Sequence, residues 1–263
     1  VSTCLRIRRS TCFPVSSSAA RRAPLNGLIA LVGAGAYLPV MEDVDRYLLS
    51  SVNSKMPRVV CLPTAAGQEG DDSVNRWSRM GVEHFQKLGA DVQALRIIDK
   101  ESANDPQFDS ALENADFIYF SGGSPLHLFQ TMQGSRAWTS MQKAWNRGAV
   151  YAGCSAGAMI LSKRVPSFRL AQNIEGFGIV PVQFILPHFD EMPLVFKPMI
   201  FALRKQLKKG EQMLGVDENT ALVGPLRQAQ GGGEWKVMGQ GTVHLITRDK
   251  DKVFKVGESV PLN

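Results

Sequence analysis

Short apolar runs alternate with longer amphipathic stretches along most of this chain. The runs are rich in Val, Ile, Leu and Phe, as the buried strands of a parallel sheet are. The stretches between them carry apolar residues at helical spacing. This alternation predicts an α/β fold in which helices cover both faces of a doubly wound, mostly parallel sheet. We expect strands at 27–33, 58–63, 92–97, 116–122 and 149–154, and helices at 41–52, 73–89, 126–132 and 136–148.

The pattern changes after residue 154. We expect a helix at 158–164 and a longer one at 193–210, kinked at Pro198 because proline interrupts the helical hydrogen-bond ladder. From residue 214 to residue 249, short apolar runs separated by glycines predict short strands joined by turns. The sequence shows no internal repeat or low-complexity linker, so we expect residues 27–263 to form a single domain.

Residues 1–26 differ from the rest of the chain in composition. They hold five arginines and no acidic residue, and therefore account for five of the six formal positive charges. The remainder is nearly neutral, so no nucleic-acid partner is expected. We predict a disordered basic tail outside the fold. No run of about 18 apolar residues occurs, so we expect no membrane association and a cytoplasmic protein, with organellar import as the alternative because the tail resembles a transit peptide.

The spacing of cysteines and histidines does not match a metal site. Cys4 and Cys12 lie in the tail, Cys61 and Cys154 lie in apolar runs, and no C-x-x-C pair occurs. We therefore expect reduced thiols and no metal. The loop after the first predicted strand has Leu38 where a dinucleotide-binding fingerprint needs glycine, so we expect no cofactor.

The segment VYAGCSAGAMIL, residues 150–161, places a serine among small residues at the end of a predicted strand. Small residues let a helix pack closely on a strand, which is one reason for such a pattern. The other reason is chemical, because Gly153, Ser155 and Gly157 spell G-x-S-x-G, the pattern of a nucleophile on a tight strand-to-helix turn. Cys154 lies one position early for this role, so Ser155 is the candidate nucleophile.

A Gly-Gly loop lies one β-α unit before this serine. Gly122 and Gly123 stand at the end of the predicted strand at 116–122, where adjacent glycines let backbone N–H groups face a ligand. Ala156 provides a further N–H at the start of the following helix. These three residues are candidate donors to the oxyanion that forms in acyl transfer.

A nucleophilic serine needs a base, and the chain has four histidines. His84 lies on an amphipathic helix and is expected at the surface or at the boundary of the core. His127 follows the Gly-Gly loop and is able to face the same pocket, whereas His244 alternates with apolar residues on a late strand. His188 follows an apolar run that Pro187 ends, so it is the preferred candidate base.

A carboxylate should orient that histidine and fix its tautomer. Asp190 and Glu191 come just after His188, while Asp217 and Glu218 end a later strand-like run. The residues alone leave these four alternatives open.

Five segments in this order, PTAAG, SGGSPLHLF, AGCSAGAMIL, LPHFDE and GVDENTAL, resemble peptidase family S51. That family contains aspartyl dipeptidase and cyanophycinase, and its fold is like that of the flavodoxin-like class I glutamine amidotransferases. The resemblance covers about residues 27 to 247. It implies a serine hydrolase with Ser155 as nucleophile, His188 as base and Glu218 as orienting acid, and with backbone N–H groups of Gly123 and Ala156 in the oxyanion hole.

The chain departs from the cyanophycinase pattern around the histidine. Cyanophycinases place a glutamine before it and several arginines shortly after it. Here Pro187 precedes His188, and Arg204 is the first arginine that follows. The resemblance therefore favours hydrolysis of another small substrate, with aspartyl peptides as one candidate class.

Three functions follow from these observations. The leading hypothesis is a serine peptidase or amidase that cleaves a small peptide or amide through an acyl-enzyme. A second is an esterase of the α/β-hydrolase type, whose order of serine, acid and histidine is met by Ser155, Asp217 and His244. A third is a non-catalytic binding module on the same fold. A homo-oligomer is compatible with each of them.

Overall fold

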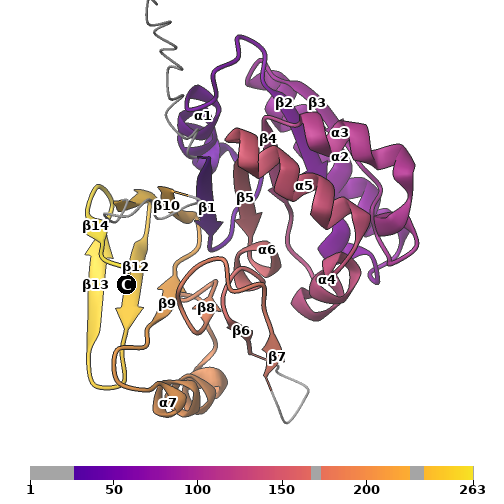
Figure 1. Cartoon of the computed structure of the whole chain (residues 1–263). Coiled ribbons are helices and arrows are strands. Elements are labelled where there is room, and N and C mark those ends of the chain that lie inside the picture. The colour runs from indigo at the N-terminus through magenta and orange to yellow at the C-terminus, as the bar shows by residue number, and fades with distance from the viewer. Residues whose placement is uncertain (1–26, 167–172, 226–233, 263) are drawn as a thin grey trace, which may run out of the picture.

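The computed structural model describes residues 27–166, 173–225 and 234–262 (Figure 1). The predicted tail, residues 1–26, lies outside these ranges. The glycines at 231–233, which belong to the predicted strands and turns of 214–249, also lie outside them, just before the strand that begins at Trp235. Among the described helices, none is long and apolar enough to cross a membrane.

The central sheet has eight strands among the described residues. They are β1 (Leu28–Val32), β2 (Arg58–Leu62), β3 (Asp91–Ala94), β4 (Phe117–Phe120), β5 (Val150–Cys154), β10 (Thr220–Pro225), β11 (Trp235–Gly239) and β14 (Ser259–Val260). Their order is β14-β11-β10-β1-β5-β4-β2-β3. Strands β1 to β5 pair in parallel, and β10, β11 and β14 extend the sheet in antiparallel pairing. The five parallel strands are those that the sequence predicted, although β3 is shorter.

Helices cover both faces of this sheet, as predicted. Side chains of β1 alternate between two hydrophobic clusters. Ile29 and Leu31 pack in the cluster that includes residues of helices α3, α4 and α5, whereas Ala30 and Val32 pack with residues of α1 and α2. The helices in chain order are α1 (Glu42–Ser50), α2 (Asp71–Lys87), α3 (Asp109–Asn114), α4 (Pro125–Met132), α5 (Arg136–Arg147), α6 (Ala156–Met159) and α7 (Lys197–Gln206), with 3-10 turns η1 (Pro39–Met41), η2 (Thr64–Ala66), η3 (Ser102–Asn104), η4 (Pro106–Phe108) and η5 (Leu194–Phe196).

A second, four-stranded sheet lies beside the first, toward the lower left of Figure 1. It consists of β8 (Ile185–Leu186), β9 (Met213–Val216), β12 (Thr242–Ile246) and β13 (Asp251–Lys255), in the order β13-β12-β9-β8. Strands β8 and β9 are parallel. The short strands predicted in the last third of the chain are therefore present, and they divide between the two sheets.

The prediction of a helix over 158–164 is wrong. Helix α6 is a single turn that ends at Met159, and the chain then enters the short strand β6 (Arg164–Val165), which pairs with β7 (Ile174–Glu175). The hydroxyl of Ser162 donates to the carbonyl of Met159, which closes the helix end. Lys163 and Arg164 then donate their N–H groups to the carbonyls of residues 182 and 183, so extended pairing replaces the helix.

The helix predicted at 193–210 is shorter than expected and has no proline kink in its interior. It consists of the turn η5 followed by α7, and Pro198 lies in the first turn of α7. Proline is tolerated there because the first N–H groups of a helix have no intrahelical acceptor. The helix therefore begins at this proline instead of bending at it.

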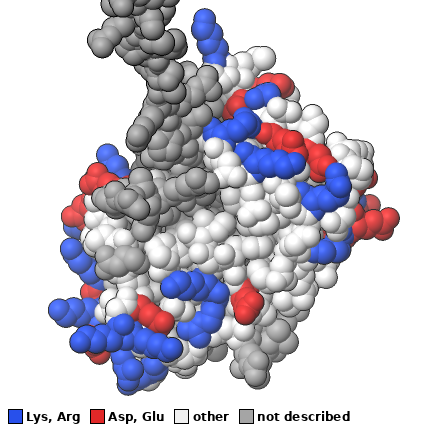
Figure 2. Space-filling model, viewed as in Figure 1, with Lys and Arg blue, Asp and Glu red and all other residues white. Residues whose placement is uncertain are grey.

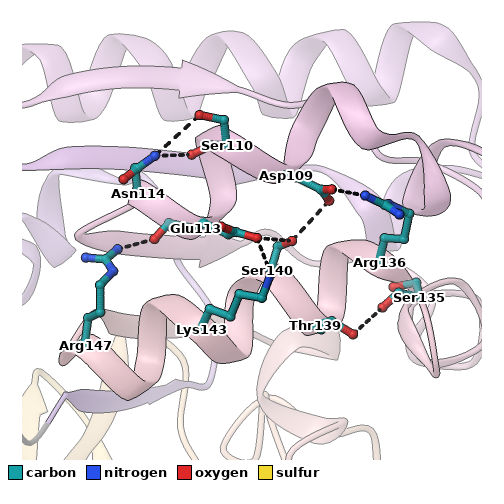
Figure 3. A network of polar contacts seen from close by, with 10 residues as sticks. All are labelled: Asp109, Ser110, Glu113, Asn114, Ser135, Arg136, Thr139, Ser140, Lys143 and Arg147. Atoms are coloured by element: carbon teal, nitrogen blue, oxygen red, sulfur yellow. Dashed lines mark hydrogen bonds and ion pairs between the residues drawn. The ribbon is translucent and has the colours of Figure 1, made fainter.

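Polar contacts fix α5 against α3 (Figure 3). Arg136 pairs with Asp109, Lys143 pairs with Glu113 at 2.5 Å, and the hydroxyl of Ser140 donates to Asp109 at 3.1 Å. These pairs are partly exposed, so each contributes little to stability. On the face drawn in Figure 2, basic and acidic side chains are accordingly interspersed over these helices.

His84 lies deeper than the predicted surface or boundary position. Only 8% of this residue is exposed, and its Nε2 lies 2.8 Å from Oδ2 of the buried Asp45 on α1. Burial raises the pKa of the Asp45 carboxyl, against the opposing effect of the hydrogen bond from His84. The pair connects α1 to α2 on the face of the sheet that these two helices cover, and the amphipathic pattern of α2 did not reveal it.

Replacing Asp45 by alanine is expected to lower the free energy of unfolding by about 3–5 kcal/mol, because His84 then remains buried without its partner. Urea denaturation followed by circular dichroism measures the change. Asp43→Ala on the exposed side of the same helix is the matched control, and it should cost less than about 1 kcal/mol. Equal stability of the two variants would contradict the assigned role of the buried pair.

Candidate active site

The carboxyl ends of the parallel strands border a cavity of about 400 Å³. Loops at this edge bind ligands in open α/β sheets. The loop after β1 contributes Ala34, Gly35 and Ala36 to the cavity wall, and Leu38 lies close by. Gly122, Gly123, Ser155 and His188 line the same cavity, so four of the residues singled out in the sequence meet there.

Ser155 stands at the turn between β5 and α6 with a φ of 51° and a ψ of −106°, a conformation rare for a residue with a side chain. Its N–H donates to the carbonyl of Val32 at the end of β1. A Cβ on Gly153 would lie 2.4 Å from the backbone of Gly157, and a Cβ on Gly157 would lie 2.9 Å from Phe120. Both glycines are therefore needed for the tight turn that exposes the serine. The small residues thus serve both purposes considered above, because the close packing of α6 on β4 and β5 is also what presents the hydroxyl.

The parallel pairing of β8 with β9 brings His188 and Glu218 together. In this register Leu186 lies opposite Gly215, so the residues just beyond both strands meet at one end of the second sheet. Phe189 extends the contact by donating its N–H to the carbonyl of Val216 at 3.1 Å. His188 and Glu218, which are far apart in the sequence, therefore lie side by side at this end of the second sheet.

Ser155, His188 and Glu218 form one hydrogen-bonded chain. His188 Nδ1 lies 2.6 Å from Glu218 Oε1, and His188 Nε2 lies 3.1 Å from Ser155 Oγ. An ionised carboxylate only accepts hydrogen bonds, so Nδ1 carries the proton that faces Glu218. Nε2 of the neutral ring is then an acceptor for the Ser155 hydroxyl. The carboxylate thus selects the tautomer in which the histidine is able to take a proton from serine.

The other three candidate acids have different positions. Asp217 is buried and accepts hydrogen bonds from the N–H and the hydroxyl of Thr242 through Oδ2. Asp190 accepts the backbone N–H of Glu218 at 2.8 Å, so it fixes the segment that carries Glu218. Glu191 is exposed. Of the four acids, Glu218 is the one with a hydrogen bond to His188.

The remaining histidines have their own partners. His127 Nε2 lies 2.7 Å from the carbonyl oxygen of Ile98 and donates to it, and His127 is not among the residues that line the cavity, so the alternative in which it serves Ser155 is not supported. His244 pairs with Asp251 on the neighbouring strand β13, at 3.3 Å. The alternative order of Ser155, Asp217 and His244 is therefore not assembled in this fold.

Cys154 is buried at the end of β5. Burial raises the pKa of its thiol to about 12, so the thiolate is essentially absent near neutral pH. This environment favours Ser155 over Cys154 as the candidate nucleophile.

The Gly-Gly loop packs against η2, which is formed by the PTAAG segment. Ser124 donates its N–H to the carbonyl of Ala65 at 2.8 Å. Gly123 has a φ of +144°, and a Cβ there would lie 2.4 Å from the same carbonyl oxygen. Glycine is therefore required for this approach, which holds the loop beside Ser155. Ala156 is the first residue of α6, where a backbone N–H has no intrahelical acceptor.

Gly123→Ala is expected to lower kcat by about 10²-fold or more, because the clash with Ala65 displaces the loop and its N–H groups. Gly89→Ala is the control, because Gly89 also has a positive φ, +86°, but a Cβ there would have nothing within 4 Å. It should cost about 1–2 kcal/mol of stability and leave kcat unchanged. Peptidase assays and urea unfolding of both variants separate the two effects, and equal kcat values would contradict the role of the loop.

The cavity includes residues of α2 that the sequence analysis did not single out, namely Arg76, Trp77 and Met80, together with Glu69 just before the helix. They follow a helical repeat that also fits an ordinary surface helix, and no motif marks them. Within residues 27–166, 173–225 and 234–262, no group of three or more His, Cys, Asp or Glu is arranged to hold a metal ion.

The protein thus combines a mostly parallel α/β sheet with a serine, a histidine and a carboxylate that are linked by hydrogen bonds, an arrangement that resembles the catalytic side chains of serine hydrolases. The sequence model of peptidase family S51 matches residues 28–228, and the chain belongs to that family. Family membership makes the protein a hydrolase of the peptidase class.

Known proteins resemble the chain over much of its length. The peptidase YgaJ of Bacillus subtilis (strain 168) is 28% identical over 166 residues, which cover 62% of this chain and 68% of that protein. The peptidase Lmo0363 of Listeria monocytogenes is 28% identical over 143 residues, or 51% of this chain and 67% of that protein. The crystal structure of a peptidase from an acI-B1 Actinobacterium is 33% identical and has a TM-score of 0.80, over 91% of this chain and 98% of that one.

Proposed function

We propose that this protein is a serine peptidase that hydrolyses small peptides or amides through an acyl-enzyme on Ser155. The observation that carries the proposal is the hydrogen-bonded chain from Ser155 through His188 to Glu218 at the wall of the cavity. Membership of a peptidase family supports the same reaction class. Aspartyl dipeptides are the first substrates to test, because the sequence motifs resemble those of aspartyl dipeptidase.

The reaction begins when His188 Nε2 takes the proton of the Ser155 hydroxyl and the oxygen attacks the scissile carbonyl carbon. Glu218 stabilises the imidazolium that forms. Backbone N–H groups of Gly123 in the Gly-Gly loop and of Ala156 at the start of α6 donate to the oxyanion, with Gly122 as a third candidate donor. His188 then gives its proton to the leaving amine. Water, activated by the same histidine, hydrolyses the acyl-enzyme and restores Ser155.

The test measures amino-acid release from α- and β-aspartyl dipeptides, with non-aspartyl dipeptides and simple esters as controls. A fluorophosphonate, which phosphonylates activated serines, is added in parallel, and peptide mapping identifies the modified residue. We expect peptide cleavage, its inhibition by the fluorophosphonate, and an adduct on Ser155.

Other outcomes count against the proposal in distinct ways. Peptide cleavage that resists the fluorophosphonate would indicate another nucleophile. Cleavage of esters without any cleavage of peptides would favour the esterase hypothesis. Absence of both turnover and adduct would favour a binding module.

A further inference from the structure

The cavity beside Ser155 contains an arginine without a carboxylate partner. Arg46, Arg58, Arg96 and Arg136 form ion pairs with carboxylates, whereas no carboxylate of the described residues lies within ion-pair distance of Arg76. Arg76 is exposed at the cavity, and its Nη2 makes one long hydrogen bond, 3.4 Å to the hydroxyl oxygen of Ser73.

Neighbouring side chains position this guanidinium. The Ser73 hydroxyl donates to Glu69 Oε2 at 2.6 Å, so Ser73 is held on the same turn and its oxygen faces Arg76. The Arg76 Cζ also lies 5.6 Å from the ring centroid of Trp77. Arg76 is thus held at the cavity wall while most of its five N–H donors remain free.

Arg76 is the one arginine or lysine among the described residues that line the cavity. Leu38, Trp77 and Met80 are apolar, and Ala34, Gly35 and Ala36 present only backbone and small side chains. A planar guanidinium fork beside such walls matches a carboxylate in both charge and geometry. A peptide small enough for a cavity of about 400 Å³ brings its C-terminal carboxylate close to the scissile bond.

We propose that Arg76 binds a carboxylate of the substrate and so selects short, anionic peptides for cleavage at Ser155. The inference rests on the proposed function, which it extends by assigning a specificity residue. The carboxylate has two sources, an acidic side chain or the free C-terminus of a short peptide. Glu69, which is close to Arg76 through Ser73, opposes the same carboxylate and weakens its binding.

Four dipeptides distinguish the two sources. Asp-Leu carries both carboxylates, Asp-Leu-amide carries the side-chain one, Asn-Leu carries the C-terminal one, and Asn-Leu-amide carries neither. Each is assayed with the wild type, Arg76→Gln and the control Arg79→Gln. Arg79 is an exposed arginine on the same helix that does not line the cavity.

We expect Arg76→Gln to lose about tenfold or more in kcat/KM for peptides with the recognised carboxylate, chiefly through KM. It should behave like wild type toward the matching peptide without that carboxylate, and Arg79→Gln should be unchanged throughout. Glu69→Gln should lower KM for the same anionic peptides, a result that a merely structural role of this turn does not produce. Equal losses for all four peptides, or no loss for any, would overturn the assignment.

Binding is measured separately so that the two proposals fail in different ways. Isothermal titration of Ser155→Ala with the four dipeptides reports affinity without cleavage, alone and combined with Arg76→Gln. Carboxylate-dependent binding that Arg76→Gln abolishes supports the assignment even if no peptide is hydrolysed, an outcome that would refute only the peptidase reaction. Binding that ignores the carboxylate, or absence of binding, would overturn the role of Arg76.

Discussion

Ser155→Ala is expected to lower kcat for peptide hydrolysis by about 10⁶-fold, the scale of losing the nucleophile of a serine peptidase. The hydroxyl is the atom that the tight turn after β5 presents to the cavity and that His188 Nε2 reaches at 3.1 Å. Alanine keeps the backbone and leaves no group to form the acyl-enzyme. Amino-acid release from the best dipeptide measures the loss, and peptide binding should remain.

Cys154→Ala is the matched control because it alters the adjacent position of the same turn. Its thiol is buried and its pKa is raised to about 12, so its loss should leave kcat within a few-fold of wild type. A moderate loss of stability, about 1 kcal/mol, is expected from the smaller side chain. Retained turnover in Ser155→Ala, or abolished turnover in Cys154→Ala, would transfer the chemistry to the thiol.

The location of the site was predictable because the parallel strands are strongly marked. Buried parallel strands read as continuous apolar runs, and their carboxyl ends must share one edge of the sheet. The Gly-Gly loop after β4 and the serine turn after β5 follow two such runs on adjacent strands. Local patterns therefore sufficed to predict that Ser155, Gly122 and Gly123 lie together at this edge, where they line one cavity.

The choice of acid was not predictable from spacing alone. Asp190, Asp217 and Glu218 all lie within two residues of a strand end or of His188, and the pairing register of β8 with β9 decides which carboxyl reaches the imidazole. That register is a long-range property of the second sheet. The resemblance to family S51 indicated Glu218, and the structure brings its carboxylate to 2.6 Å from His188.

Other differences have the same cause, which is that tertiary contacts override local periodicity. The apolar residues Ile160 and Leu161 suggested a longer helix after the serine, but they are buried in the hydrophobic core beyond the end of α6. In the sequence His84 has the pattern of a polar helix position, but in the fold it is buried and pairs with Asp45 on another helix. Arg76 is likewise indistinguishable in the sequence from other exposed arginines such as Arg79.

Glu218→Gln is expected to lower kcat by about 10⁴-fold, as when the triad carboxylate of another serine peptidase is replaced by its amide. The amide of glutamine is able to donate a hydrogen bond to His188 Nδ1 where the carboxylate only accepts. The imidazole then carries its proton on Nε2, and that atom no longer accepts from Ser155. The hydroxyl keeps its position and loses its base, so kcat falls while KM changes little.

Asp251→Asn provides the matched control, because Asp251 is the carboxylate partner of another partly exposed histidine, His244. Its kcat should equal that of the wild type. The pH dependence adds a second criterion: hydroxide replaces the missing base, so the residual activity of Glu218→Gln should keep rising with pH where the wild type has reached a plateau. If Asp251→Asn lost activity and Glu218→Gln did not, the histidine that serves Ser155 would be His244, and the esterase-type order would have to form by rearrangement of the loops around the cavity.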